Sequence, residues 1–358
     1  MHEYLSIQRE RIAAFVSEFL STETDRLCRA GAWGSDVTER LLEYTLPGKM
    51  IRGALVHLGY SLVSGREPDP VLSVAAAMEL TQSFLLIHDD IMDRDDQRRG
   101  KPAVHRQYAE VAWRRGYLGN TEHFGHAMGI CAGDIAMFLA TDLLSRADVD
   151  PGIVQRLVSC FAREIALVGV AQMSDVANAV RIDEVSTEDI ITLYRYKTGR
   201  YTFSLPLMLG AMAAGAGDGF CDDLGLLGEE IGVIFQIKDD EIGLFGDSTA
   251  TGKPVGSDIS ENKKTILRAM LFDRAPEAER ETLDRLFGSE SVTVHDVQYV
   301  RSLIDTLGIR DELQQKLELR ALACTNRIDR LFPGSGPATV RFVEILHSLV
   351  AYNLKRDR

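Results

Sequence analysis

The sequence predicts an all-α fold, a large helical bundle around a central cavity. Apolar residues recur at helical spacing, or fill whole segments, along most of the 358 residues. Alternating strand patterns bounded by hairpin turns do not occur in the sequence. Segments 71–88 and 129–144 are apolar on all sides, which is typical of helices at the centre of a bundle. No repeat of fixed period is present, which argues against a helical solenoid.

The expected helices follow one another with short connections. Pro47-Gly48 precedes the third helix, and the Gly- and Pro-containing stretches 65–70 and 332–337 are typical of loops between helices. Helical patterns cover residues 7–28, 37–46, 50–64, 71–92, 103–116, 122–146, 151–180, 187–215, 220–245, 261–272, 276–287, 294–306, 309–332 and 337–354.

The composition is that of an ordinary soluble globular protein, with 45% hydrophobic and 26% charged residues. No Ser-, Pro- or Gly-rich linker and no shift in composition divides the chain. We therefore expect residues 1–358 to form a single domain, with a motif-bearing core at about 45–265.

The net charge of −13 argues against nucleic acid as a partner, because no dominant basic face is available to neutralise phosphates. The N-terminal residues lack the charged-then-apolar pattern of a signal, and no apolar run reaches the length expected of a membrane span. The cysteines form no CxxC pair, which indicates neither a disulfide framework nor a zinc site; they are Cys28, Cys131, Cys160, Cys221 and Cys324. We expect a cytoplasmic protein without a transmembrane segment.

Two aspartate pairs, Asp89-Asp90 and Asp239-Asp240, each lie at the end of a long apolar segment. Carboxylates are rarely buried unless they are paired or bound to a metal. Asp93 and Asp96 follow Asp89 at positions i+4 and i+7, which predicts that all three lie on one helical face. Like charges so close repel unless a cation lies between them. Mg²⁺ fits, because it takes a few carboxylate oxygens and completes its shell with water and substrate phosphates.

Basic residues near these pairs complete a predicted diphosphate site. Lys49 and Arg52 stand at a probable helix start, where free N–H groups also favour an anion. Arg98 and Arg99 follow the first aspartate pair, and guanidinium groups bind phosphates in a bidentate way. Thr-Gly-Lys at 251–253 and Asn-Lys-Lys at 262–264 lie in the polar stretch after the second pair.

In this order, the motifs resemble those of the trans-isoprenyl diphosphate synthases, the polyprenyl synthase family, and most of all its geranylgeranyl diphosphate synthases. GKMIR at 48–52 is similar to the family's GKxxR, and DDIMD followed by RRGKP to its first Asp-rich motif. Gln172 and Asp175 are similar to its QxxD pair, and YKTGRYTFSLPL to its Lys-Thr segment. FQIKDD, FGD and TGKPVGSD resemble its second Asp-rich motif. The resemblance covers roughly Lys49 to Lys264.

The resemblance implies a Mg²⁺-dependent prenyltransferase that condenses isopentenyl diphosphate with dimethylallyl, geranyl or farnesyl diphosphate and releases diphosphate. It implies three Mg²⁺ ions, with Asp89 and Asp93 holding two and Asp239 a third. Indirect roles through water or hydrogen bonds fall to Asp90, Asp175 and Asp240. The allylic diphosphate is assigned to Arg98, Lys197 and Lys253. The diphosphate of isopentenyl diphosphate is assigned to Lys49, Arg52, Arg99 and Gln82, the last of which is His in many relatives. Lys263 matches a further basic position, and residues 355–358 are expected to close over the second substrate.

The residue chemistry also predicts how an allylic cation would be stabilised. Oriented oxygens are expected from the Lys197 carbonyl, the Thr198 hydroxyl and the Gln236 amide, in a dry site. An irregular helix at Gly199 would free the carbonyl, because glycine tolerates such backbone. The departed diphosphate is the expected base for the final proton loss, and His88 is expected to be structural or to support a site residue without touching substrate.

One residue departs from the family pattern: Gly243 replaces the last aspartate of the second motif. This leaves the activity expected but puts the outer details of the metal site in question. Two rival functions remain: a class I terpene cyclase, against which Lys49, Arg52 and FQIKDD argue, and a regulatory subunit, which usually loses one Asp motif or the Arg pair. The resemblance also implies a homodimer, and residues 122–146 are apolar enough to supply an interface helix.

Product length is predicted from the residues that precede Asp89. Leu85 and Thr81 lie four and eight residues before it, within 80° of its direction at about 100° per residue, whereas Phe84 sits near 140°. Phe84 would therefore narrow a product tunnel from its flank, while Leu85 leaves the nearer position open. A single Phe at the fifth position resembles relatives that stop at twenty carbons. Farnesyl diphosphate or longer polyprenyl products are the alternatives.

Overall fold

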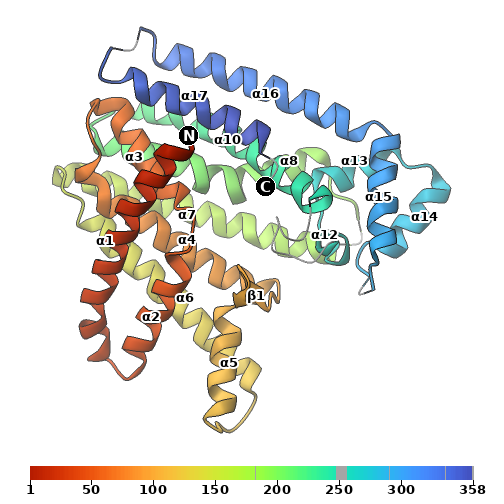
Figure 1. Ribbon diagram of the computed structural model, residues 1–358, viewed down its shortest axis with the longest axis horizontal. Helices are drawn as coiled ribbons and strands as arrows, with labels where there is room; N and C mark the ends of the chain where they lie inside the picture. Colours follow the sequence, from red (N-terminus) through yellow and green to blue (C-terminus); the bar gives the residue numbers. More distant parts are fainter. Residues whose placement is uncertain (182, 247–255, 290, 335, 357–358) are drawn as a thin grey trace. The chain divides into compact units, whose positions relative to one another are not determined.

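The computed structural model describes residues 1–181, 183–246, 256–289, 291–334 and 336–356 (Figure 1). The predicted all-α fold is confirmed: in the described part of the chain, helices form nearly all of the regular structure. The only strands described there are β1 (Gln97–Arg98) and β2 (Lys101–Pro102), which pair antiparallel in a short hairpin.

The contacts of the chain divide it into two compact units. Unit 1 comprises Met1–Phe161 and Pro206–Cys221, and unit 2 comprises Ala162–Leu205 and Asp222–Arg358. Each unit is described by itself below, and the single domain expected from the sequence stays a prediction.

In unit 1, α4 (Leu72–Met92) is the central helix. It packs against α1 (His2–Cys28), α3 (Ile51–Ser64) and α6 (Thr121–Ser145). Twelve of its residues are buried, which agrees with the all-round apolar pattern of the sequence. The remaining elements are α2 (Trp33–Thr45), the 3₁₀ turn η1 (Asp69–Val71), α5 (Val104–Arg114), most of α9 (Leu205–Ala213) and the first residues of α7 (Pro151–Val180) and α10 (Asp218–Phe245).

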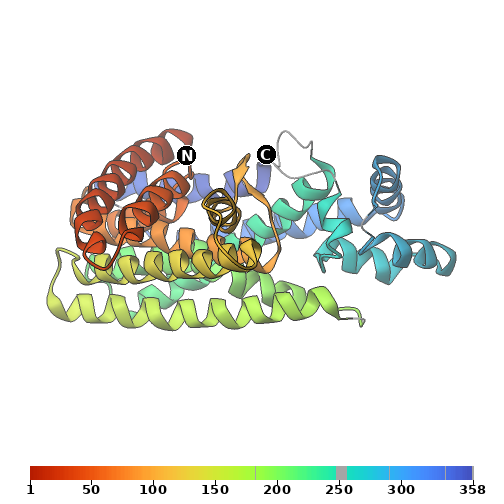
Figure 2. The ribbon, with the colours of Figure 1, turned by 90° about the horizontal axis from the view of Figure 1, so that it is seen from below.

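Two pairs of neighbours in unit 1 illustrate how its helices meet. α1 and α2 lie side by side (Figures 1 and 2). α3 and α9 approach through two glycines. A Cβ atom on Gly59 would lie 2.2 Å from the carbonyl oxygen of Leu207, and one on Gly210 would lie 2.0 Å from that of Val56. Any larger residue at either position would therefore force the two backbones apart.

Unit 2 contains the rest of α7 and α10, and also α8 (Thr187–Tyr194) and the π-helix η2 (Arg195–Ser204). The C-terminal helices are α12 (Ser257–Ser260), α13 (Ile266–Arg274), α14 (Glu277–Leu286), α15 (Val294–Thr306), α16 (Ile309–Leu331) and α17 (Val340–Lys355). α16 and α17 pack side by side (Figure 1). Local signals fix several starts: the Ser186 hydroxyl caps α8, and Thr293 forms a capping box with Asp296 at α15.

Most predicted helices are confirmed within a few residues, with instructive differences. The first helix begins at His2, and the helix predicted from 261 begins at Ile266. The predicted helix 187–215 is three elements, α8, η2 and α9. α4 ends at Met92, so the expectation that Asp96 continues its helical face was wrong. Arg94 has a φ of 58°, which turns the chain out of the helical direction.

Two helices correct the expectation about apolar length. Asp69–Met92 and Thr121–Ser145 are long and apolar enough to cross a membrane by length and composition. In their most apolar windows 61% and 44% of the residues are buried inside the protein, and core helices pass the same test.

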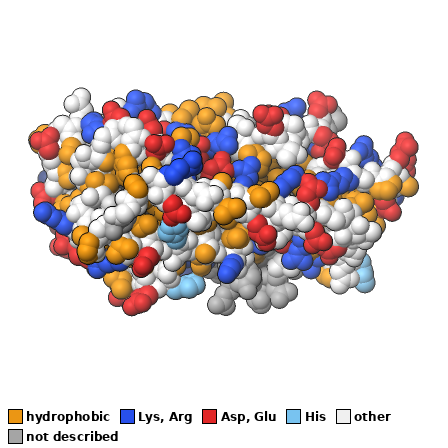
Figure 3. Space-filling model, turned by 90° about the horizontal axis from the view of Figure 1, so that it is seen from above, with side chains coloured by type: hydrophobic (Ala, Val, Ile, Leu, Met, Phe, Trp, Pro, Cys, Tyr) orange, Lys and Arg blue, Asp and Glu red, His pale blue; other side chains and the backbone are white. Residues whose placement is uncertain are grey.

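On the face drawn in Figure 3, acidic and basic side chains are interspersed over the described residues.

Candidate functional site

The first Asp-rich motif lies in the last turn of α4. Asp89 is partly exposed, Asp90 is completely buried, and Asp93 is the exposed C-cap residue whose N–H donates to the carbonyl of Asp89 at 2.8 Å. Asp89 and Asp93 are thus one helical turn apart, as predicted. Asp96 lies beyond the helix, and its carboxylate pairs with Arg106 at 3.1 Å.

Asp90 anchors Arg98, a basic residue of the β1–β2 hairpin. The Arg98 Nε donates to Asp90 Oδ1 at 2.7 Å, and the Tyr44 hydroxyl donates to Asp90 Oδ2 at 2.9 Å. Arg98 also contacts Asp95 at 3.3 Å. Burial raises the pKa of Asp90 against the pull of the Arg98 guanidinium. Asp90 therefore orients Arg98 from the protein side, which fits the indirect role predicted for it.

The turn that carries Lys49 and Arg52 is held from three sides. Arg9 Nε donates to the Gly48 carbonyl at 2.9 Å, and the Arg99 Nη1 donates to the Tyr44 carbonyl at 3.0 Å. The buried Glu79 accepts a 2.8 Å hydrogen bond from the N–H of Gly53 in the first turn of α3. This satisfies one of the N–H groups that a helix start leaves unpaired.

The basic residues of this turn lie close to one another. Arg52 and Arg99 interact electrostatically with each other and with Glu79. Burial lowers the pKa of Arg99 below its ordinary value. Gln82 lies on α4 one turn after Glu79, and Lys49 is exposed. Unit 1 thus holds the basic set predicted for isopentenyl diphosphate together with the first Asp-rich motif.

The second Asp-rich motif lies near the end of α10. Thr198 Oγ1 donates to Gln236 Oε1 at 2.7 Å, and Gln236 Nε2 donates to Asp240 Oδ1 at 2.9 Å. The Tyr194 hydroxyl donates to Asp240 Oδ2 and accepts from the Ile266 N–H. Burial raises the pKa of Asp240 to about 8. The structure thus brings together Thr198, Gln236 and Asp240, and the chain of hydrogen bonds fixes the orientation of the Gln236 amide.

Asp239 is exposed and pairs with a residue from the end of α17. The Arg356 Nη2 lies 2.8 Å from Asp239 Oδ1, and its guanidinium lies 4.2 Å from the ring centre of Phe235. The C-terminal basic segment therefore reaches the predicted metal ligand itself. Its last two residues, Asp357 and Arg358, lie outside the described residues.

Lys197 donates a hydrogen bond to Asp175 on α7, so the predicted catalytic lysine contacts a residue for which an indirect role at the metal site is predicted. Lys263 pairs with Asp258 at 3.4 Å and with Glu261 at 3.2 Å. Lys253 lies outside the described residues.

A residue that the sequence reasoning missed lies beside Gly243. A Cβ atom at position 243 would be 2.7 Å from Asp258 Oδ2. Asp258 also interacts electrostatically with Asp240. Its carboxylate therefore lies next to the position where the family pattern has the last aspartate of the motif. The signal was present in the sequence, because Asp258 ends the segment TGKPVGSD.

The predicted chain-length residues all lie on α4. Thr81 is completely buried, and its hydroxyl donates to the Ala77 carbonyl at 2.8 Å. Phe84 and Leu85 are half-buried. The Phe84 ring meets His88 edge-on, with the ring centres 4.8 Å apart. His88 in turn lies 3.1 Å from the Ile130 carbonyl on α6, a structural contact like the one expected for it.

Comparisons with known proteins identify the family of this chain. The polyprenyl synthetase family model matches residues 35–304. The chain is 33% identical over 263 residues to a geranylgeranyl diphosphate synthase of Saccharolobus solfataricus, covering 73% of this chain and 74% of the relative. It is 34% identical over 220 residues to a (2E,6E)-farnesyl diphosphate synthase of Mycobacterium bovis, covering 61% of this chain and 55% of the relative.

Among solved structures, the chain is similar to a geranylgeranyl pyrophosphate synthase of Corynebacterium glutamicum complexed with isoprenyl diphosphate and magnesium. The TM-score is 0.87 at 28% identity, covering 100% of this chain and 99% of that one. The family match spans both Asp-rich motifs and the basic residues described above, so the chain belongs to the polyprenyl synthetase family.

Proposed function

We propose that this chain is a Mg²⁺-dependent prenyltransferase that makes geranylgeranyl diphosphate from isopentenyl diphosphate and the allylic primers dimethylallyl, geranyl or farnesyl diphosphate. One observation carries the proposal: both aspartate pairs have the same division of roles. The first member, Asp89 or Asp239, is partly exposed, and the second, Asp90 or Asp240, is buried and anchors neighbouring polar side chains.

The donor groups fit Mg²⁺, which prefers carboxylate oxygens and keeps several positions for water and phosphate. No group of three or more His, Cys, Asp or Glu side chains that could hold a metal converges among the described residues. An ion held by one or two carboxylates plus substrate phosphates needs no such group. Asp89, Asp93 and Asp239 would hold the ions, three in all. When bound, they would neutralise the charge of the leaving diphosphate.

The protein's own residues would divide the remaining work. Arg98, fixed by Asp90, and Lys197, fixed by Asp175, would hold the allylic diphosphate together with Lys253. The basic set Lys49, Arg52, Arg99 and Gln82 would hold isopentenyl diphosphate, and Lys263 would add positive charge. Thr198 and Gln236 would present oxygens to the allylic cation, because their mutual hydrogen bond fixes both side chains.

Support for a twenty-carbon product comes from the geranylgeranyl diphosphate synthases among the relatives and from Phe84 on α4. A farnesyl diphosphate synthase is also among them, so fifteen carbons is the nearest alternative and a longer product the next. A class I terpene cyclase or a regulatory subunit fits less well, because the chain retains both Asp-rich motifs and the basic residues at the start of α3.

We also propose a homodimer in the cytoplasm. Large apolar side chains are exposed on α6, where Ile130 is 46% and Phe138 73% exposed. α7 exposes further ones, among them Val170 at 61% and Met173 at 73%. Large exposed apolar side chains are typical of surfaces that another chain covers.

The test is product analysis. Purified protein is incubated with isopentenyl diphosphate, each allylic primer in turn, and Mg²⁺, and the products are separated by chain length. Geranylgeranyl diphosphate as main product supports the proposal. Products of fifteen or of more than twenty carbons would show that the proposed product length is wrong and would leave the prenyltransferase activity in place. Cyclic hydrocarbons made without isopentenyl diphosphate would point to a cyclase, and no turnover by the chain alone would point to a subunit.

A further inference from the structure

We propose that Arg200 is a positioning residue: with Glu164 and Glu229 it fixes the π-helix η2, so that Lys197 and Thr198 stay aligned with Asp175 and Gln236. The inference rests on the proposed function, in which Lys197 and Thr198 take part in the reaction. Arg200 itself is not assigned to substrate.

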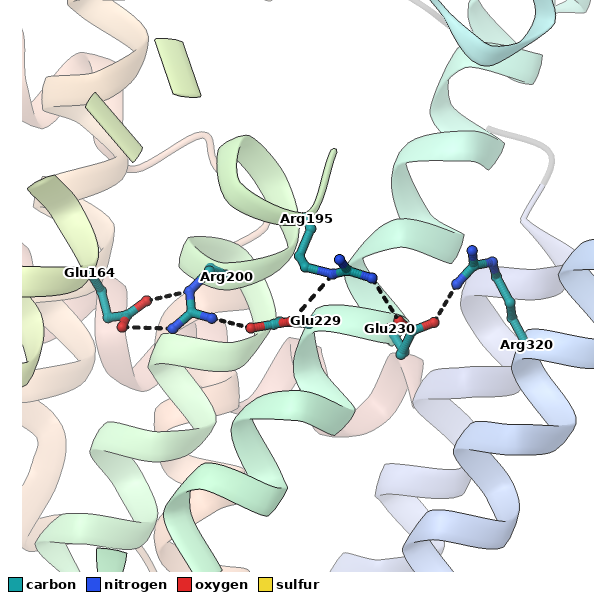
Figure 4. Close-up of polar contacts among 6 residues, drawn as sticks. All are labelled: Glu164, Arg195, Arg200, Glu229, Glu230 and Arg320. Atoms are coloured by element: carbon teal, nitrogen blue, oxygen red, sulfur yellow. Dashed lines mark hydrogen bonds and ion pairs between the residues drawn. The ribbon is translucent and has the colours of Figure 1, made fainter. Parts of the chain in front are cut away.

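A row of alternating charges crosses unit 2 (Figure 4). Its members, in order, are Glu164, Arg200, Glu229, Arg195, Glu230 and Arg320. The row connects α7, η2, α10 and α16. Within the row, the Arg200 guanidinium donates three hydrogen bonds. Its Nε and Nη2 donate to the two carboxylate oxygens of Glu164 at 2.7 and 2.8 Å, and its Nη1 donates to Glu229. Arg195 contacts Glu229 and Glu230 at 3.4 Å each.

The row gives η2 a second attachment to each of the two helices that it already contacts through predicted catalytic residues. On α7, Lys197 reaches Asp175 and Arg200 reaches Glu164, eleven residues earlier. Eleven residues are about three helical turns, so the two carboxylates lie on one face of α7. On α10, Thr198 reaches Gln236 and Arg200 reaches Glu229, two turns earlier and again on one face. Attachment at two levels on each helix fixes both the position of η2 and its rotation.

The backbones of η2 and α10 are close enough for such alignment to matter. A Cβ atom on Gly232 would lie 2.2 Å from the Cα of Gly199, and one on Gly199 would lie 2.9 Å from the Glu229 carbonyl oxygen. Gly199 directly follows Lys197-Thr198. A small rotation of η2 would therefore move Thr198 relative to Gln236 on α10 and Lys197 relative to Asp175 on α7.

Burial makes Arg200 the central member of the row. The side chains of Glu164 and Glu229 are 10% and 7% exposed, whereas those of Glu230 and Arg320 are 32% and 31% exposed. Hydrogen bonding to Glu164 raises the pKa of Arg200, and burial raises that of Glu229. Without the guanidinium, Glu164 would lose both hydrogen bonds from Arg200, and Glu229 would keep the longer contact with Arg195. Two nearly buried carboxylates would then lie beside η2 with less positive charge to hold them. Lysine cannot reproduce this, because it lacks the planar fork that binds both oxygens of Glu164.

The experiment compares Arg200→Met and Arg200→Lys with Arg327→Met in the full chain. Arg327 is a matched control: it lies on α16 and pairs with Asp223 on α10 at 3.0 Å, but contacts no residue of the row. We expect Arg200→Met to lower kcat at least about tenfold, since small misplacements of reacting groups cost rates of that order. KM for isopentenyl diphosphate should stay near the wild-type value, because its basic set is held by contacts within unit 1. Arg200→Lys should fall in between, and Arg327→Met should match the wild type.

Hydrogen exchange supplies a readout that needs no turnover. Amides of residues 195–204 should exchange faster in Arg200→Met, and those of α16 should not. Should Arg200→Met fail to fold, Glu164→Gln replaces it in the test, because glutamine keeps a hydrogen-bonding partner for Arg200 while removing one charge. We expect Glu164→Gln to lower kcat by less than is expected for Arg200→Met and to speed amide exchange in η2.

An unchanged kcat in folded Arg200→Met overturns the inference, and so does an equal loss in Arg327→Met. The same holds if only the folded fraction falls while kcat per folded molecule stays constant. Absence of turnover in the wild type would instead refute the proposed function. Exchange at 195–204 would then still decide whether Arg200 holds η2.

Discussion

Each Asp-rich motif places two neighbouring carboxylates in opposite surroundings. Successive residues of an α-helix point about 100° apart, so one member of a pair can face outward while the next faces the protein. Asp90 and Asp240 are 0% and 9% exposed and hold neighbouring side chains. In the proposed metal site, this division would let the outer residue bind the ion while the inner one orders the surrounding side chains.

Asp89→Ala and Asp239→Ala should each lower turnover by several orders of magnitude, with the fold intact. Without Mg²⁺ Asp89 lies one turn from the like charge of Asp93, so the free energy of unfolding of Asp89→Ala should be unchanged or slightly raised. Asp239→Ala also removes the ion pair with Arg356, so its free energy of unfolding should be slightly lowered. Steady-state kinetics and thermal melts measure both effects. Asp284→Ala on the exposed side of α14 is the control for lost charge. Near-normal turnover in either variant, or full wild-type activity in excess chelator, would rule out the metal assignment.

Phe84→Ala should shift the products to longer chains, and Leu85→Phe should shorten them. Phe84 contacts His88, which α6 holds in place, so its ring is a fixed obstacle. Leu85 lies nearer the direction of Asp89, where an added ring would stop the chain earlier. Product chromatography with farnesyl diphosphate as primer measures both shifts. If neither substitution changes the product spectrum, chain length is limited elsewhere.

At the scale of elements, sequence periodicity predicted the helices because their apolar residues recur at helical spacing and are largely buried. The irregularity at Gly199 was also predictable, since glycine permits it. Its extent over Arg195–Ser204 was not, because it depends on α10 approaching through Gly232, thirty-three residues later. The end of α4 at Met92 was predicted, but the position of Asp96 was not, because the following DRDDQ segment contains no glycine or proline and a non-glycine residue, Arg94, takes the left-handed conformation.

Gly232→Ala should lower both stability and turnover. The added methyl group would meet backbone, which cannot move aside as a flexible side chain can, so overpacking should cost about 1–3 kcal/mol. Gly219→Ala on the same helix has nothing within 4 Å of the new Cβ and should be neutral or slightly stabilising. Chemical denaturation and kcat measure the two effects. Equal behaviour of both variants would contradict the close approach of η2 and α10.

At the scale of the whole molecule, the motifs gave the family and the kinds of site residue, but not their partners. Arg356 and Asp239 are 117 positions apart, and no pattern in the sequence joins them. The row through Arg200 likewise connects four helices by charges that, in sequence, resemble any solvated helix face. Long-range contacts depend on how helices pack, and hydrophobic spacing specifies only which faces pack.

Phe138→Glu and Val170→Glu should convert a dimer into monomers, because a charge in a covered apolar surface is costly. Leu319→Glu on α16 is the control, since Leu319 is equally exposed at 68% and is not assigned to an interface. Sedimentation or light scattering at micromolar concentration gives the mass. A wild type that is monomeric under these conditions would refute the homodimer.

The stability of the protein should fall on mild acidification partly through His57. This completely buried side chain bonds to Gln8 at 2.6 Å, and burial lowers its pKa to about 3. The unfolded chain takes up a proton near pH 6.5 while the folded one does not, so stability is full above that pH and is lost as pH falls toward 3. Between pH 6.5 and 5 the loss from this one group is about 2 kcal/mol.

Denaturation of His57→Gln across this range should therefore show a shallower decline than the wild type. His347 is partly exposed and pairs with Asp329 at 3.2 Å, so His347→Gln serves as the control and should leave the steep decline in place. If the free energy of unfolding falls with pH in parallel for the wild type and His57→Gln, His57 does not titrate on unfolding.

The positions of the cysteines make it possible to measure which of the two units unfolds first. Cys28 and Cys131 are exposed, whereas Cys160 and Cys221 are buried in unit 1 and Cys324 in unit 2. Burial raises the pKa of Cys324 to about 12, and only thiolates react readily with alkylating reagents. After the two outer thiols are blocked, a pulse of such a reagent would mark each inner thiol only when its own unit unfolds. Mass spectrometry of the marked peptides would then time the two units separately, without any engineered label.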